Sequence, residues 1–185
     1  MAKLSYSTSA FKRLVLLDEH QPVIRTYDVD VINSAALSAG DIVGKGASGK
    51  VRKLARTTVK QDVSSNATIP VNDATLFAAN DYVWIGSEAS ATKINSVDTA
   101  NGTITLASAI SCSEDDPVVA VGAGEAVGIL LDDVSADGKA AVLVHGVVCK
   151  DYVGNYSAYT EALPANIKAY EFNGIENRIW FKAQY

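Results

Sequence analysis

Residues 37–54 read LSAGDIVGKGASGKVRKL, and the fold of the chain depends on what these glycines do. The central part, Gly44 to Lys50, satisfies the pattern GxGxxG and nearly satisfies the phosphate-binding pattern GxxxxGK(S/T). Both patterns need a helix directly after the glycines, because the first amides of that helix face the phosphates. Here residues 51–59 follow, which are β-branched at both ends and place Val51 where a Mg²⁺-binding hydroxyl is required. The stretch favours a glycine-rich turn between two strands.

The rest of the chain has the rhythm of an all-β protein. Glycines and short polar turns recur about every 8 to 12 residues, with β-branched runs between them. A closing strand is expected at Arg178–Lys182. The ten strands expected before it are Val23–Tyr27, Asp41–Gly44, Lys50–Leu54, Ala67–Val71, Tyr82–Ile85, Thr92–Val97, Thr103–Ala107, Val118–Val121, Ala126–Leu131 and Ala140–Val148.

Turn and helix signals refine this prediction. Asn101-Gly102 is expected to supply positive φ to one hairpin, and Ala136-Asp137-Gly138 is expected to form the turn of another. A short helix is expected from Pro164 to Tyr170, and a single helical turn capped by Asp73 is expected within Asn72–Ala79. The predicted fold class is mostly β: a small β-barrel or β-sandwich-like domain with one short helix, plus an inserted small β module.

Composition divides the chain into segments. Residues 60–118 are rich in Ser, Thr and Asn and hold only two of the sixteen basic residues, but eight of the twenty-one acidic ones. We interpret them as a β-hairpin module inserted into a host domain formed by residues 23–59 and 119–185, since insertions are tolerated where a host chain turns at the surface. Residues 1–22 precede the first strand as a polar arm.

Charge and hydropathy exclude several classes of partner. The net charge is −5 and the pI is about 5.0, which disfavours binding to a phosphate backbone. No apolar run approaches the roughly 20 residues that span a bilayer, and the apolar stretch near the N-terminus is too short for a signal peptide, so synthesis in a cytoplasm is expected. The one basic cluster lacks interleaved aromatic residues; it consists of Lys45, Lys50, Arg52, Lys53 and Arg56.

No pattern indicates catalysis. His145 lies inside an apolar run and His20 in a polar turn, and no GxSxG nucleophile motif is present. Cys112 and Cys149 have no metal-ligand spacing and are expected to be free thiols. The carboxylate pairs favour solvated loops over a Ca²⁺ site. In Asp115/Asp116 and Asp132/Asp133 the two residues are adjacent and point to opposite faces of a strand, while Asp28 and Asp30 would share a face but have no further oxygen ligand nearby. We therefore expect no enzyme activity, cofactor or metal.

The segment Gly124–Val148 reads GEAVGILLDDVSADGKAAVLVHGVV and resembles the most recognisable stretch of lambda-type phage head decoration proteins. In that family an AVGIL strand, an acidic loop and a VLVHG strand are followed by a short helix and a last strand. The resemblance covers roughly residues 23–58 and 119–183. It implies a homotrimer on the outer surface of a virion, bound to the major capsid protein around local three-fold axes, and made in the cytoplasm of a bacterial host.

Within that role, the N-terminal arm is the segment we expect to contact the capsid. An extended arm can add a strand to an exposed sheet edge of a partner. Its apolar anchors are Phe11, Leu14, Val15 and Leu17.

Two alternatives belong to other classes. A phage head fibre or adhesion module would bind glycans through stacking rings, with candidates Tyr82, Trp84, Tyr152, Tyr156 and Tyr159. A nucleotide-binding enzyme would use Gly44–Lys50.

Overall fold

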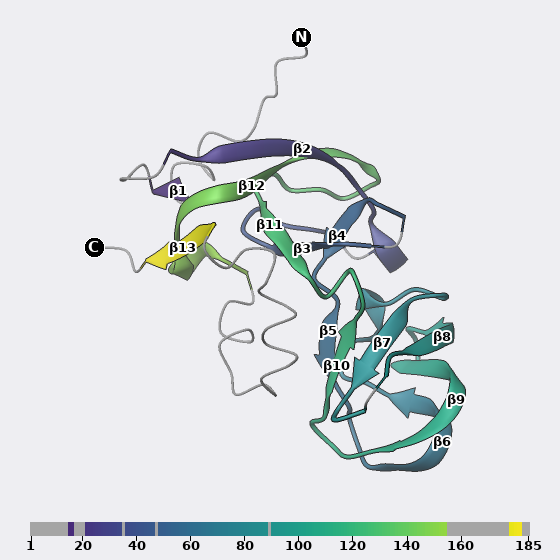
Figure 1. The fold of residues 1–185 in the computed structure, drawn as a ribbon. Helices are drawn as coiled ribbons and strands as arrows, with labels where there is room; N and C mark the ends of the chain where they lie inside the picture. The colour runs from purple at the N-terminus through teal and green to yellow at the C-terminus, as the bar shows by residue number, and fades with distance from the viewer. Residues whose placement is uncertain are drawn as a thin grey trace.

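The computed structural model describes residues 15–16, 21–34, 36–46, 48–88, 90–154 and 178–182. The chain is mostly β, as expected, and it forms two sheets in two lobes (Figure 1). Within these ranges no helix is long and apolar enough to cross a bilayer. The strands are β1 (Val15–Leu16), β2 (Val23–Val29), β3 (Ile42–Lys45), β4 (Val51–Lys53), β5 (Arg56–Thr58), β6 (Val63–Pro70), β7 (Tyr82–Ile85), β8 (Thr92–Asp98), β9 (Thr103–Cys112), β10 (Pro117–Ala120), β11 (Ala126–Leu130), β12 (Gly138–Cys149) and β13 (Ile179–Lys182), with 3-10 turns η1 (Ile32–Ser34), η2 (Ala74–Leu76) and η3 (Lys150–Tyr152).

The barrel lobe contains β1 to β4 and β11 to β13. Five strands close the barrel in the order β2–β12–β11–β3–β4, and the closing contact is the parallel pairing of Val29 with Val51. The other face of β3, β11 and β12 packs against β13 and Val153. Because both faces are buried, these strands are continuous apolar runs. Side chains from all five strands meet in one interior cluster: Val29, Leu37, Val43, Val51, Leu130, Ala140, Val142 and Val144.

The curled lobe is one continuous stretch, residues 56–120, with the strand order β5–β10–β7–β8–β9–β6. Its two edge strands approach each other where Val59 and Val71 form an isolated antiparallel bridge. Phe77, just after η2, is fully buried in the core of this lobe. The sheet begins before residue 60 because β5 pairs with β10.

Each of the ten expected strands, and the closing strand, overlaps an observed strand. Two observed strands were not expected. β1 has only two residues and β5 has the short polar sequence RTT, so neither carries a strand pattern of its own. Each extends a sheet because its partner, β12 or β10, offers a free edge.

The glycine-rich stretch forms the predicted turn. Lys45 at the end of β3 pairs with Val51 at the start of β4, so a strand follows the glycines where a phosphate-binding loop would place a helix. The Gly46 amide donates to the Lys50 carbonyl at 3.0 Å, and Gly49, at φ +81°, donates to the Gly46 carbonyl at 2.9 Å. Only a residue without Cβ adopts this φ without strain.

The other local predictions have mixed outcomes. β11 and β12 form the hairpin expected around Asp137. Asp73 caps η2 as expected, since its Oδ1 accepts the Thr75 amide at 3.0 Å. At the β8–β9 turn only Gly102 has positive φ (+65°), so the expectation for Asn101 was wrong. The expected helix at 164–170 lies outside the described residues.

Gly44 lies where the barrel meets the next connection, and this close approach gives a test. A Cβ at Gly44 would lie 2.1 Å from the backbone oxygen of Ala123, whereas a Cβ at Gly138, also on a barrel strand, would meet nothing closer than 3.8 Å. Gly44→Ala should lower the free energy of unfolding by about 1–3 kcal/mol, as overpacking does, and Gly138→Ala should change it by less than about 0.5 kcal/mol. Urea unfolding measures both, and equal effects would contradict the geometry.

Candidate functional site

Two connections of the chain, which lie side by side, join the two lobes. One runs from β4 to β5 and the other from β10 to β11. The Ala120 amide donates to the Ala55 carbonyl at 2.9 Å, and the Ala55 amide donates to the Ala123 carbonyl at 3.2 Å. All three alanines are fully buried. These bonds hold the two connections to each other and continue the β5–β10 pairing.

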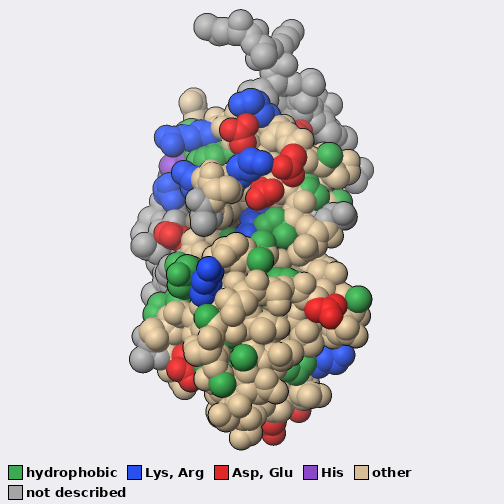
Figure 2. All heavy atoms as spheres, turned by 90° about the vertical axis from the view of Figure 1, so that its right-hand side faces the viewer, with side chains coloured by type: hydrophobic (Ala, Val, Ile, Leu, Met, Phe, Trp, Pro, Cys, Tyr) green, Lys and Arg blue, Asp and Glu red, His purple; other side chains and the backbone are tan. Residues whose placement is uncertain are grey.

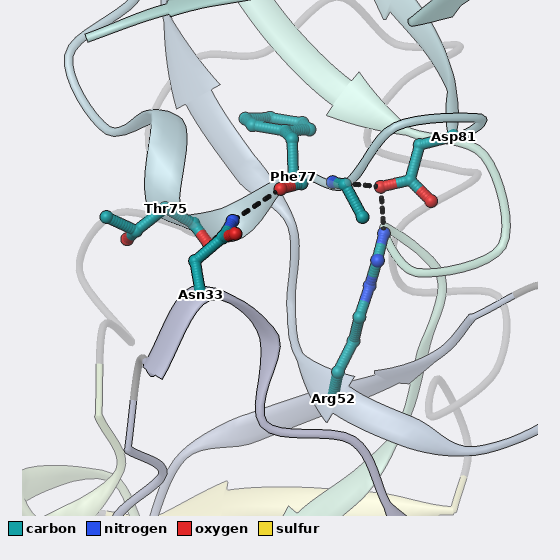
Figure 3. A network of polar contacts seen from close by, with 6 residues as sticks. Asn33, Arg52, Thr75, Phe77 and Asp81 are labelled. Carbon is teal, nitrogen blue, oxygen red and sulfur yellow. Dashed lines mark hydrogen bonds and ion pairs between the residues drawn. The ribbon is translucent and has the colours of Figure 1, made fainter. Parts of the chain in front are cut away.

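A buried ion pair crosses the same junction (Figure 3). Arg52 of β4 places Nη2 2.6 Å from Oδ2 of Asp81, which lies just before β7, and the side chains are only 6% and 11% exposed. The Asp81 carboxylate also accepts the Ala78 amide at 2.8 Å. A buried pair of this kind contributes little net stability over apolar residues, but removing one partner leaves an uncompensated buried charge.

Asn33 makes a second polar contact between the lobes (Figure 3). Its Nδ2 donates to the carbonyls of Phe77 at 2.7 Å and Thr75 at 3.1 Å. Asn33 has left-handed backbone angles, φ 51° and ψ 33°, which asparagine tolerates better than most residues. The cavity beside this network, lined in part by Arg52 and Thr75, has a volume of only about 10 Å³. It is roughly the size that one water molecule needs, so the junction is a structural joint and not a ligand pocket.

The predicted docking anchors are only partly placed. Phe11, Leu14 and Leu17 lie outside the described residues. The backbone of Val15 pairs antiparallel with Val148, and that of Leu16 with Val147, so this part of the arm is a strand on the protein's own β12. The assignment of the four anchors to capsid docking stays a prediction.

The basic cluster is largely neutralised within the barrel lobe and across the junction. Lys53 Nζ lies 3.9 Å from Asp41, and Arg52 pairs with Asp81. Lys50 stands where a phosphate-binding loop has its lysine, yet its Nζ lies 3.0 Å from Asp137 Oδ2. The pKa of the Asp137 carboxyl lies below its usual range. The main cause is the hydrogen bond that the Val31 amide donates to it, and the second is the hydrogen bond from Lys50. Three of the five cations of the cluster thus have a carboxylate partner.

Residues considered for catalysis are not brought together. His145 on β12 packs edge-on against Trp180 of β13, with ring centroids 5.2 Å apart, as expected of a structural imidazole. Asp132 and Asp133 accept backbone amides of Ala141 and Ala39. In the part of the chain that the structure describes, no three His, Cys, Asp or Glu side chains converge as metal ligands. His20 lies outside that part.

A shallow acidic groove surrounds Cys112 at the end of the curled lobe. It is lined by Cys112, serine hydroxyls and the carboxylates of Asp62 and Asp116. Partial burial and then Asp116 raise the pKa of the Cys112 thiol, so the thiol is protonated at neutral pH and is a poor nucleophile. Both cysteines are free, as predicted, although Cys112 is half-buried and only Cys149 is fully buried. The sequence analysis did not predict this groove, for which the Ser- and acid-rich run 111–116 was the available signal.

The outer face of the curled sheet exposes aromatic side chains on β7. Tyr82 is 50% exposed and Trp84 is half-buried, while the alternate residues Val83 and Ile85 face the core. Lys93 of β8 lies opposite Tyr82. Tyr152 is 40% exposed in η3, and Tyr156 and Tyr159 lie outside the described residues.

Comparison with known proteins adds no assignment. A scan against models of known families finds no match to this chain, and a search of curated proteins finds none either. The fold defines the chain as a mostly-β protein with a five-stranded barrel and a curled sheet, which contact each other through a buried ion pair. Figure 2 shows charged side chains crowded on the barrel lobe and sparser on the face of the curled lobe that is turned to the viewer.

The Arg52–Asp81 pair can be tested by a double-mutant cycle. Arg52→Met should cost about 3–5 kcal/mol, because it leaves the Asp81 carboxylate buried without its cation. Adding Asp81→Leu should restore part of that loss, so the double variant should be more stable than Arg52→Met alone. Urea unfolding provides the measurement.

The matched control for this cycle is Lys139→Met, which breaks the exposed pair with Asp28 (3.2 Å). Its unfolding midpoint should not move, since exposed pairs contribute little. Strictly additive effects of the two junction substitutions would show that the pair is not coupled.

Proposed function

We propose that this protein is a non-enzymatic structural component of a tailed-phage virion that binds the outside of the capsid, in the manner of lambda-type decoration proteins. The observation that carries the proposal is the hairpin of β11 (AVGIL) and β12, whose central residues read VLVHG. Leu130 pairs with Val142 and Ile129 with Leu143 across the acidic loop. This is the strand order that the resemblance implies, with a last strand, β13, beside β12.

The arm is the segment proposed to contact the capsid, by adding a strand to an exposed sheet edge of the capsid protein. Val15 and Leu16 pair with the protein's own β12, so the part of the arm proposed to bind the capsid is the part that precedes β1. β1 lies on the side of the barrel lobe away from the curled lobe (Figure 1). A shell bound at that side would leave the curled lobe projecting outward.

A trimer makes weak contacts of this kind effective. Once one arm is bound, the other two are held near their sites at a high effective concentration. Binding only to the assembled shell then stabilises that shell by mass action. We therefore propose the major capsid protein and two further copies of this chain as the partners, and the outer capsid surface as the location.

Co-sedimentation with empty shells tests this proposal. The shells are assembled from the major capsid protein encoded in the same genome. The full chain should sediment with them and should elute as a trimer or become trimeric on the shell. Deleting residues 2–14, which removes Phe11 and Leu14 but keeps β1, should abolish binding and leave the unfolding transition unchanged.

Tyr82→Ser is the control, since Tyr82 lies on the curled lobe, and this variant should bind shells as the full chain does. Full occupancy of the shells by the deletion variant would discard the arm as the docking element. A genome without a capsid gene would discard the proposal itself.

The exposure of Tyr82 favours a second candidate function, glycan binding by a head fibre or adhesion module. Tyr82 and Trp84 share one face of β7, and aromatic faces offer apolar stacking surface beside polar groups such as Lys93. A glycan array should then show a signal that Tyr82→Ala removes, with Tyr152→Ala as the control for an exposed tyrosine elsewhere. An array that stays blank with the full chain would contradict this function.

A further inference from the structure

The tip of the β8–β9 hairpin carries an exposed asparagine followed by glycine. The four-residue loop 99–102 joins Asp98, which pairs with Thr103, to the start of β9. Asn101 is exposed in this loop. We infer that Asn101 is a site of spontaneous deamidation in the folded protein, an inference that does not depend on the proposed function.

The reaction needs only water and no enzyme. The backbone nitrogen of Gly102 loses its proton to solvent base and attacks Cγ of the Asn101 side chain. A C–N bond forms, the Cγ–Nδ2 bond breaks, and ammonia leaves with the proton it takes up. Water then opens the cyclic succinimide at either carbonyl, which yields aspartate or isoaspartate at position 101.

Gly102 removes the main steric obstacle to ring closure. It has no side chain to crowd the attacking nitrogen, and its φ of +65° is one that glycine leaves readily, because its allowed range is wide. The surrounding space is open, since a Cβ at Gly102 would meet only the Val71 carbonyl oxygen, at 3.4 Å.

Three other asparagines of the curled lobe are less suited to the reaction. Asn95 lies within β8, is followed by Ser96, and donates through Nδ2 to the Leu106 carbonyl at 3.3 Å. Asn72 and Asn80 are each followed by an aspartate, whose side chain and charge hinder deprotonation of the attacking nitrogen. These three residues provide an internal standard in the same molecule.

Asp98 affects both the rate of deamidation at Asn101 and the electrostatics of the hairpin tip after the reaction. Its Oδ2 accepts Asn101 Nδ2 at 2.7 Å and its Oδ1 accepts the Asn101 amide at 3.0 Å, so the side chain must leave this hold before it reacts. The Asn101 side chain is also the main reason that the pKa of the Asp98 carboxyl lies below its usual range. After deamidation a second carboxylate faces Asp98 in place of a donor, on a lobe that is already acidic.

Ageing the full-length protein at mildly alkaline pH in ¹⁸O-labelled water tests the inference. Peptide mapping by mass spectrometry should find ¹⁸O-containing aspartate and isoaspartate at position 101. Conversion there should be at least about tenfold faster than at Asn95, a ratio equal to about 1.4 kcal/mol in activation free energy. Equal rates at Asn101 and Asn95, or no label at position 101, would overturn it.

Two variants separate chemistry from folding. Asn101→Gln should remove the signal at this position while Asn173-Gly174, the other Asn-Gly pair of the sequence, is followed in its own peptide. Asp98→Ala should speed conversion at Asn101 several-fold relative to the wild-type chain. The rate in concentrated urea gives the upper limit, because the unfolded chain lacks the hydrogen bonds to Asp98. A rate in Asp98→Ala below that of the wild-type chain would contradict the role assigned to Asp98.

Discussion

The buried pair of Arg52 and Asp81 constrains how the two lobes are arranged. A guanidinium and a carboxylate that are almost fully buried must remain together, because separating them inside the protein would expose each to a medium that solvates charge poorly. The pair fixes β4 of the barrel against the start of β7 in the curled lobe. Asn33 adds two hydrogen bonds nearby, and the fully buried alanines of the connections leave little room for the lobes to slide.

The strands were predictable where one local pattern was sufficient. Val51, directly after the glycine-rich stretch, argued against a phosphate-binding loop, and the structure has a strand there. Asp73 predicted the N-cap of a helical turn, which is η2. β5 was missed because its three residues become a strand only beside β10. The turn at Asn101 was misassigned because a contact with Asp98, and not positive φ, shapes that residue.

The site was less predictable than the fold. Arg52 was grouped with neighbouring cations as one basic cluster, yet its partner is 29 residues away and belongs to the other lobe. No spacing rule reveals such a pair, since it depends on how two sheets meet. The exposed ring of Tyr82 was recognisable as a candidate, because alternation along β7 assigns it to the face opposite Val83.

The adjacency of β5 and β10 has a consequence for modularity. The chain enters and leaves the curled lobe through neighbouring antiparallel strands, which lie about 4.8 Å apart. The barrel therefore sees this lobe as a loop with closely spaced ends, whatever its internal size. Exchanging the whole unit for a tight turn therefore demands no change in the path of the barrel strands, but it requires an apolar residue in place of Arg52, which would otherwise lose Asp81.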